Sequence, residues 1–204
     1  MNKNLQYSQK RGFFYALYSR IFIKEADQKL LETIERNGLD DCFPNFSKWD
    51  VRDNLSKSKL IKERLDADFA EISLLNLIPY ESFYIREDGM IQSGGENPVI
   101  KFYEEFDYMV DKEKARIVSP DHIGAELEFM YMLCEGELKA LKNCDENAAT
   151  KIKEIQKSFL QKHILKWVPL YLINVKNEAQ TPFYHDAAMT GLEFVLSDYE
   201  YLNE

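Results

Sequence analysis

The sequence predicts an all-α protein that folds as one globular helical domain. Apolar residues recur at three- and four-residue spacing through most of the chain, which is typical of amphipathic helices. Only 8 Gly and 6 Pro occur among 204 residues, which disfavours a turn-rich β fold. A domain of this length buries about 70% of the surface of its unfolded chain. We therefore treat 1–204 as one domain, with two subdomains joined near residues 92–98 as the alternative.

Three helices are predicted in the first part of the chain, over residues 7–23, 26–36 and 58–75. The apolar stripe of the first is formed by Phe14, Leu17, Tyr18, Ile21 and Phe22. The inward residues of the second are Leu30, Leu31 and Ile34, and those of the third are Ile61, Leu65, Phe69 and Ile72. We expect the second helix to end at Gly38, because glycine accepts the left-handed conformation that closes a helix.

Three stretches lack a helical period. Residues 39–57 predict a connecting loop with one irregular turn. Residues 77–91, which contain an Asp88-Gly89 turn, predict either a short hairpin or an extended surface loop. Residues 92–98 predict a hinge or the joint between subdomains, so that 76–98 form a flexible connection.

Four further helices complete the prediction. One begins at Pro98, ends before Ser119 and turns inward Val99, Phe102, Tyr103, Phe106 and Val110. A second, over about residues 125–139, has a stripe of Ile123, Leu127, Met130, Tyr131, Cys134 and Leu138. A third, bent near its end by Pro169, carries Ile152, Ile155, Phe159, Ile164, Trp167 and Leu170. The last starts at Pro182 and presents Tyr184, Ala187, Ala188, Leu192, Val195, Tyr199 and Leu202.

The charge and the cysteines restrict the class of partner and the compartment. The net charge of −9 disfavours nucleic acid and fits a basic peptide. Cys42, Cys134 and Cys144 form no C-x-x-C pair and are expected to be reduced, packed thiols. No signal-peptide pattern opens the chain and no window of about 18 residues is free of charge, which predicts a cytoplasmic protein without stable membrane insertion.

The most informative stretch is Ser119-Pro120-Asp121-His122. Ser119 suits a helix N-cap, Pro120 the first helical position, and Asp121 the positive end of the helix dipole. Capping accounts for these three residues. It does not require the imidazole of His122, which is therefore a candidate functional group.

One functional hypothesis, the alternative to a peptide-binding protein, is a metal-dependent hydrolase. His122 and Glu126 lie four residues apart, so on a helix they would share a face and offer two metal ligands. No H-E-x-x-H motif, phosphate-binding loop or nucleophile elbow is present, and His163 and His185 are distant in sequence. We read Ser93-Gly94-Gly95 as a hinge, and predict a protein with no cofactor and no metal.

A second unusual group is the cluster of Pro79, Tyr80, Phe83 and Tyr84 within six positions. Such rings can pack a loop onto the core, line a groove for a peptide, or form an oligomer contact. Tyrosine hydroxyls would add polar contacts to a peptide groove.

Three short motifs, in this order, resemble the redox-enzyme maturation chaperones of the TorD and DmsD type, with NarJ more distant. An aromatic followed by x-x-Leu-Phe in the opening helix is similar to Tyr18-Ser19-Arg20-Ile21-Phe22, with Ile in place of Leu. A loop of Pro, aromatic, x, Ser, apolar and aromatic residues looks like Pro79-Tyr80-Glu81-Ser82-Phe83-Tyr84. A Pro-x-Asp-His-type turn that enters an apolar helix resembles residues 120–130, although the glutamate often found ahead of the Asp-His pair is absent.

The resemblance implies an all-helical, cytoplasmic chaperone that is not an enzyme. Such a protein binds the twin-arginine signal peptide, and in some cases the body, of a molybdopterin-dependent oxidoreductase and assists cofactor insertion before export. It implies a peptide site with Asp121 and His122, lined or shaped by Pro79, Tyr80, Ser82 and Tyr84. An oligomer contact through the aromatic cluster would make the protein a homodimer, and otherwise we expect a monomer. An acidic surface beside aromatic rings suits a basic, partly apolar peptide.

Overall fold

A computed structural model describes residues 3–94 and 97–203 and confirms the all-α fold. Within these two ranges the only β-type pairing is an isolated antiparallel bridge between Tyr80 and His122. One main core cluster includes residues from both the first and the last helix. No helix of the described part is long and apolar enough to cross a membrane.

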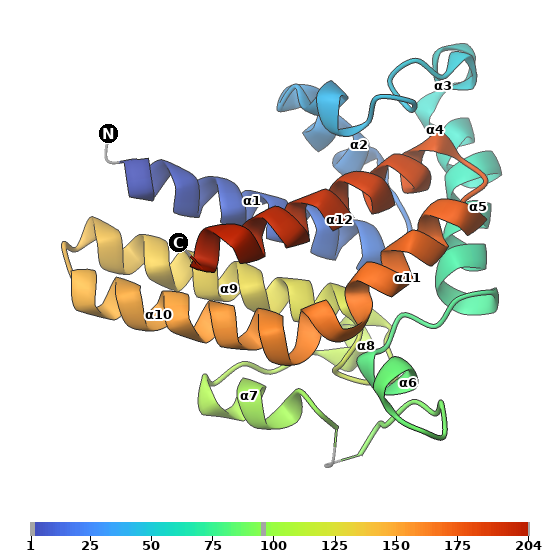
Figure 1. Cartoon of the computed structure of the whole chain (residues 1–204). Helices are drawn as coiled ribbons and strands as arrows, with labels where there is room; N and C mark the ends of the chain where they lie inside the picture. The colour runs from blue at the N-terminus through green and yellow to red at the C-terminus, as the bar shows by residue number, and fades with distance from the viewer. Residues whose placement is uncertain (1–2, 95–96, 204) are drawn as a thin grey trace.

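Four long helices form the main bundle: α1 (Lys3–Ile23), α9 (Ile123–Lys142), α10 (Glu146–Phe159) and α12 (Pro182–Asn203). They run side by side in Figure 1, where α11 (Leu165–Glu178) continues toward the far end of the molecule. Helix α9 packs along α1 and α10 and is buried over most of its circumference. It is therefore the central element of the bundle.

The predicted opening helices are confirmed. The chain turns after α1 into α2 (Gln28–Arg36), which begins where the Asp27 carboxylate accepts a hydrogen bond from the Leu30 N–H at 2.8 Å. It ends before Gly38, which has a φ of +61°. The third predicted helix runs from residue 57 to 75 as α4 (Lys57–Leu60) and α5 (Asp66–Ala70), joined and extended by the π-helical turns Ile61–Leu65 and Glu71–Leu75.

The loop predicted for 39–57 is partly wrong, because it contains a 3-10 helix (Leu39–Cys42) and α3 (Asp50–Asn54). Its aromatic residues reach the core without a helical period. Phe43 stacks on Phe183 with ring centroids 5.3 Å apart, and Asp186 accepts hydrogen bonds from the backbone N–H of Phe46 at 2.9 Å. A distant helix, α12, thus fixes this segment.

The hairpin predicted for 77–91 is wrong, and the loop is correct only in part, since residues 81–85 form a short helix, α6 (Glu81–Ile85), between irregular segments. The helix predicted from Pro98 is also shorter than expected. It appears as α7 (Ile100–Glu105), ends before Asp107 at a φ of +52°, and is followed by α8 (Lys112–Ala115), with Val110 between the two helices.

The later helices need four corrections. Helix α9 begins at Ile123, so Ser119 is not its N-cap and Pro120 is not its first residue. Tyr131 and Leu170 were placed on inward stripes but are 36% and 53% exposed, because the buried faces of α9 and α11 lie on either side of them. The change of direction between α10 and α11 coincides with the π-helical turn Leu160–Ile164, upstream of Pro169 (Figure 1). Cys144 is exposed in the turn after α9 and is not packed.

The predicted hinge lies partly outside the described residues, which exclude Gly95 and Glu96. Around that gap, Asn97 is buried and its Nδ2 donates to the Gln92 carbonyl at 2.6 Å. The subdomain alternative stays a prediction.

Candidate peptide-binding site

The two segments singled out in the sequence lie side by side and form one junction, residues 79–84 and 118–123. The Glu81 N–H donates to the Asp121 carbonyl and the Ile123 N–H donates to the Pro79 carbonyl, both at 3.0 Å. These bonds flank the bridge between Tyr80 and His122. The junction thus attaches α6 to the start of α9.

Asp121 caps α6, not α9. Its Oδ2 accepts a hydrogen bond from the Ser82 N–H at 2.7 Å, and the Ser119 hydroxyl contacts its Oδ1. Asp121 is fully buried. A carboxylate at the first turn of a helix is favourable, as the sequence suggested, but the helix belongs to another segment.

His122 is the N-cap of α9, so the view that capping does not involve this imidazole is wrong. Its Nδ1 accepts the Gly124 N–H at 3.0 Å, which requires an unprotonated Nδ1. Burial lowers the pKa of His122 to about 3, so the ring is neutral near pH 7. The ring also packs edge-on against Tyr80, with centroids 5.0 Å apart.

Polar contacts attach Gln92 and Asn97 to the same junction. The Ser82 Oγ accepts the Gln92 N–H at 2.9 Å, and Asn97 Nδ2 donates to Ser119 Oγ at 2.9 Å. The Tyr80 hydroxyl accepts the Val118 N–H at 3.2 Å. Sequence reasoning missed Gln92 and Asn97, because their partners are defined only by the fold.

A buried acidic cluster, also missed, lies beside the junction. Glu81 Oε2 is 2.9 Å from His163 Nδ1, and Glu126 Oε2 accepts the Trp167 Nε1–H at 3.1 Å. The other Glu126 oxygen has no hydrogen-bond partner in the described part of the chain. Burial, with the charges of Glu81 and Asp121, raises the pKa of Glu126 well above its ordinary value.

The structure gives no support to the metal-hydrolase alternative. His122 uses its Nδ1 to cap α9 and lies outside the helix, so it does not share a helical face with Glu126. Within the described residues no group of three or more His, Cys, Asp or Glu side chains is arranged to hold a metal ion.

The predicted site residues are brought together, but most are inaccessible. Pro79, Tyr80, Ser82, Asp121 and His122 are buried, and the polar side chains already have intramolecular partners. In this arrangement they determine the position of α6. They do not offer open contacts to a ligand.

Tyr84 is the predicted site residue that reaches the surface. Its ring lies 5.3 Å from that of Trp167 and 6.5 Å from that of Tyr171 on α11. Burial raises the pKa of Tyr84, an effect opposed by its hydrogen bond to Asn174.

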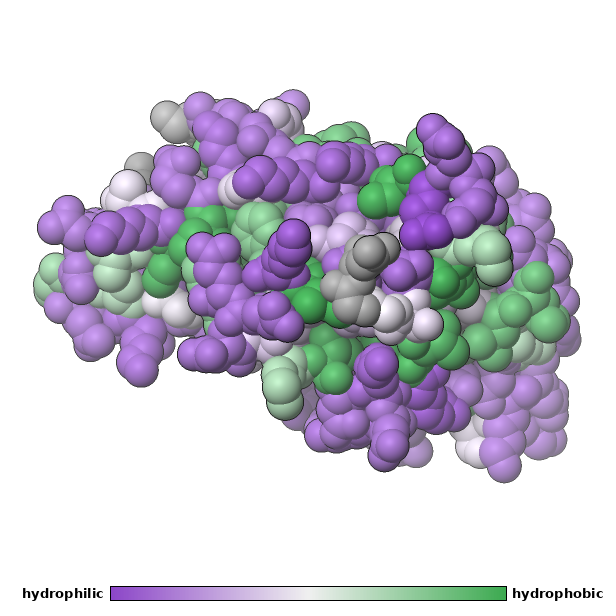
Figure 2. Space-filling view, turned by 90° about the horizontal axis from the view of Figure 1, so that it is seen from below, coloured by the Kyte–Doolittle hydropathy of each residue, from purple (hydrophilic) through white to green (hydrophobic). Residues whose placement is uncertain are grey.

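Exposed apolar side chains also lie on α6, on α11, which packs against α6, and on the end of the 57–75 helix, which packs against α11. We call this set the α6–α11 apolar face: Leu74 (70% exposed), Leu75 (73%), Ile85 (41%), Leu170 (53%), Ile173 (44%) and half-buried Tyr84. Figure 2 shows apolar patches between polar side chains on the side of the molecule where α6 lies in Figure 1.

Two acidic residues adjoin the same elements. Asn76 Nδ2 lies 3.3 Å from Glu71 Oε2 and 3.5 Å from Glu178 Oε2, so both carboxylates are near the chain just after Leu75. Exposed leucines next to carboxylates suit a ligand that is both apolar and basic.

The residues of the first motif are structural. Tyr18, Ile21 and Phe22 are all buried in α1, and the Tyr18 hydroxyl donates to Thr190 Oγ1 on α12 at 3.0 Å. They connect α1 to α12 and to α11, where the Phe22 ring centroid lies 6.3 Å from that of Tyr171.

Comparison with known proteins finds relatives that are named as chaperones. Over 96% of its length the chain is 29% identical to the chaperone protein TorD of Vibrio parahaemolyticus, of which 96% is covered. It is 33% identical to the chlorate reductase assembly chaperone protein of Ideonella dechloratans and 32% identical to the selenate reductase assembly chaperone protein of Thauera selenatis. Each of these two matches covers 40% of this chain and 38% of the relative. No solved structure matches at a comparable significance.

The family model described as the nitrate reductase delta subunit matches residues 51–172, more than half of the chain. That range contains α6, the junction and α9. The chain therefore belongs to the nitrate reductase delta subunit family, and its resemblance to the TorD-type maturation chaperones is confirmed.

Proposed function

We propose that this chain is a cytoplasmic assembly chaperone, not an enzyme, that binds the twin-arginine signal peptide of a molybdopterin-dependent oxidoreductase. By holding the enzyme before export it would assist insertion of the cofactor. Full-length similarity to a TorD chaperone supports the chaperone role, and the partial relatives named for chlorate and selenate reductase assembly support a molybdoenzyme client.

The observation that carries the peptide-binding proposal is the α6–α11 apolar face. Solvent exposure of Leu74 and Leu75 above two thirds is unfavourable for a protein that never covers them. The apolar segment of a signal peptide would cover this face, and its arginines would pair with Glu71 and Glu178. The apolar face thus matches the apolar segment of the signal peptide, and the two carboxylates match its arginines.

In this proposal the buried residues of the junction act indirectly, without contacting the peptide. Asp121, His122, Pro79, Tyr80 and Ser82 hold α6 in place, and α6 in turn presents Tyr84 and Ile85. They are positioning residues, and Tyr84 contacts the peptide.

Titration with a synthetic twin-arginine signal peptide tests this proposal. Ile173→Asp should weaken binding by about tenfold, because a carboxylate interrupts the apolar contact. Leu196→Asp on α12 is a matched control, since Ile173 and Leu196 are both 44% exposed. Equal affinity of the two variants would move the site elsewhere, and no binding by the unmodified protein would exclude the signal peptide as its ligand.

A further inference from the structure

The N-terminal helix differs in charge from the rest of the protein. Residues 1–24 contain five basic side chains and no acidic one, in a chain whose net charge is −9. Arg11 is buried and bound to Glu137 and Asp198, so the basic charge at this surface comes from Lys10 and Arg20 on α1 and from Lys24 in the turn that follows it. This end of the molecule therefore attracts a different class of ligand from the acidic remainder.

A groove with an apolar floor runs beside this charge. A cavity of about 380 Å³ lies between α1 and α2, with Phe13, Ala16, Leu17 and Leu30 among its lining residues. A second cavity, of about 400 Å³, extends along α1 toward Gln6 and also contacts Phe13. Together they follow α1 from Gln6 to Arg20, which spans about 21 Å of helix.

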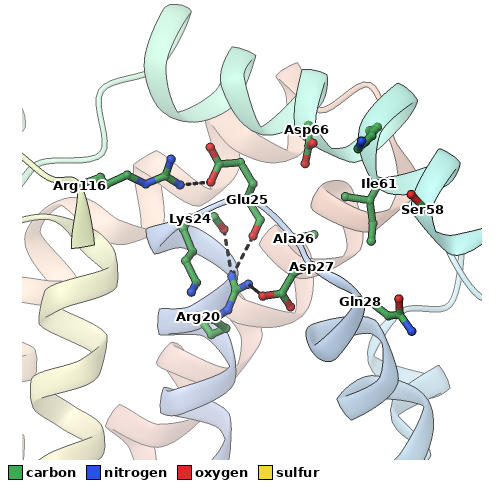
Figure 3. Close-up of a pocket in the computed structure, with 11 residues that line it drawn as sticks. Arg20, Lys24, Glu25, Ala26, Asp27, Gln28, Ser58, Ile61, Asp66 and Arg116 are labelled. Atoms are coloured by element: carbon green, nitrogen blue, oxygen red, sulfur yellow. Dashed lines mark hydrogen bonds and ion pairs between the residues drawn. The ribbon is translucent and has the colours of Figure 1, made fainter. Parts of the chain in front are cut away.

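The acidic residues at the end of this groove are already neutralised. Figure 3 shows the corner between α1 and α2 from the side of a neighbouring cavity of about 580 Å³. There Arg20 forms an ion pair with Asp27 at 2.7 Å and donates to the carbonyls of Lys24 and Glu25. The Glu25 carboxylate pairs with Arg116.

The lysines at the rim, in contrast, remain free to bind a ligand. Lys24 and Lys29 line the α1–α2 cavity and Lys10 lines its extension, and all three are exposed. None of them forms an ion pair with any residue that the structure describes. The α1–α2 cavity is lined by three basic side chains, Arg20, Lys24 and Lys29, and by one acidic side chain, Asp27, so the groove combines apolar contacts with an excess of positive charge.

We infer that this α1–α2 groove docks an acidic amphipathic helix. This inference rests on the proposed function, since the helix would belong to the folded body of the client. The apolar face of such a helix would cover Phe13, Ala16 and Leu30, and its carboxylates would meet Lys24 and Lys29. A twin-arginine peptide would be repelled by the same lysines. Signal peptide and client body therefore bind at separate surfaces of opposite charge.

Three peptides and three forms of the full chain provide the test. The acidic probe is a synthetic helix with leucines at i, i+3, i+4 and i+7 and glutamates on its flanks. Its counterpart carries lysines in place of the glutamates, and the third is a synthetic twin-arginine signal peptide. Affinities are measured by fluorescence anisotropy for the unmodified protein, for Lys24→Glu with Lys29→Glu, and for a control. The control, Lys139→Glu with Lys151→Glu, makes the same charge change at exposed positions on α9 and α10.

We expect the acidic helix to bind the unmodified protein and the control, and to bind the Lys24→Glu, Lys29→Glu variant about tenfold more weakly. Binding to the unmodified protein should also weaken with salt. The lysine helix should show the reverse preference, and the signal peptide should bind all three forms equally. Phe13→Ala provides a second variant, which should weaken the acidic helix without changing the circular dichroism spectrum.

Equal binding of the acidic helix to all three forms, or no binding at all, would overturn the inference even if the signal peptide binds. Loss of signal-peptide binding alone would instead reject the proposed function and leave the groove assignment standing. Light scattering gives an independent check. If the protein alone forms dimers that Lys24→Glu with Lys29→Glu dissociates, the occupant is a second copy of the chain and the inference is wrong.

Discussion

At the residue scale, His122 illustrates how one buried group can serve two neighbouring segments. Its Nδ1 caps α9 and its ring packs against Tyr80, which adjoins α6. The cap requires a neutral ring with an unprotonated Nδ1, and burial favours that form. The side chain is therefore suited to structural support and not to proton transfer near neutral pH.

Substitution of His122 should reveal this role through pH. Folding lowers the pKa of His122 from 6.5 to about 3, so as the pH falls the unfolded chain binds the proton before the folded protein does. The contribution of His122 to stability is therefore present above about pH 6.5 and is lost as the pH falls toward about 3. His122→Asn keeps a capping oxygen and should remove this acid-sensitive term. His122→Ala should cost roughly 1–3 kcal/mol at pH 7, since it loses both the cap and the ring contact.

Urea unfolding at several pH values measures these effects. If the difference in unfolding free energy between the unmodified protein and His122→Asn does not change from pH 7 to pH 4, the ring does not titrate as described.

The sequence could identify this stretch as important but could not assign its contacts. Ser119-Pro120-Asp121 matches the pattern of a helix start, and a helix does start nearby. The partner of Asp121, however, is the Ser82 N–H, 39 positions earlier. Local chemistry predicts that a carboxylate should cap a helix, whereas only the tertiary structure determines which helix it caps.

At the element scale, the packing of α1 against α9 requires a glycine at position 124. A Cβ atom built on Gly124 would lie 2.5 Å from the Cβ of Ile23 and 3.0 Å from its backbone Cα. The two helices therefore approach one another where no side chain separates them. The other glycine of α9, Gly136, has an ordinary environment, since its Cβ would meet only Ile152 Cδ1 at 3.5 Å.

These two glycines form a matched pair within one helix. Gly124→Ala should destabilise the protein by about 1–3 kcal/mol, because α1 must move to make room. Gly136→Ala should be neutral or stabilising by up to about 1 kcal/mol, because alanine has the higher helix propensity. Thermal and urea unfolding of the two variants give the comparison, and similar destabilisation by both would contradict the proposed close approach.

Elements with a long apolar period were predictable, and elements held by distant partners were not. The helices over 7–23, 26–36 and 58–75 follow from spacing alone. Helix α6 has five residues, too few for a period, and α7 ends where Asp107 adopts a positive φ. Exposed Tyr131 and Leu170 show a further limit, since an apolar residue at the edge of a stripe can face solvent.

At the scale of the whole molecule, one buried ionic network joins the four helices of the bundle. Arg11 on α1 binds Glu137 on α9 at 2.9 Å, Gln156 on α10 at 2.6 Å and Asp198 on α12. The Tyr15 hydroxyl also donates to Asp198 at 2.6 Å. The sequence pattern did not predict this network, because a charged residue that will be buried and paired cannot be distinguished by its spacing from one on the exposed face of an amphipathic helix.

Removal of Arg11 should therefore have a large effect on stability. Arg11→Met leaves Glu137 and Asp198 buried without a cation, which should cost about 3–5 kcal/mol. Lys10→Met, at the adjacent exposed position, should change stability by less than about 0.5 kcal/mol. Chemical denaturation provides the measurement, and equal stability of the two variants would mean that the network does not stabilise the bundle.

The cap of α6 by Asp121 also imposes an order on biosynthesis. A helix of five residues is not stable alone, and its cap leaves the ribosome 39 residues after the Ser82 N–H that it binds. Until then the segment that carries Tyr84 and Ile85 has no fixed position, so the α6–α11 apolar face cannot yet assemble. A nascent chain is consequently unable to engage a client through this face before α9, and then α11, have emerged.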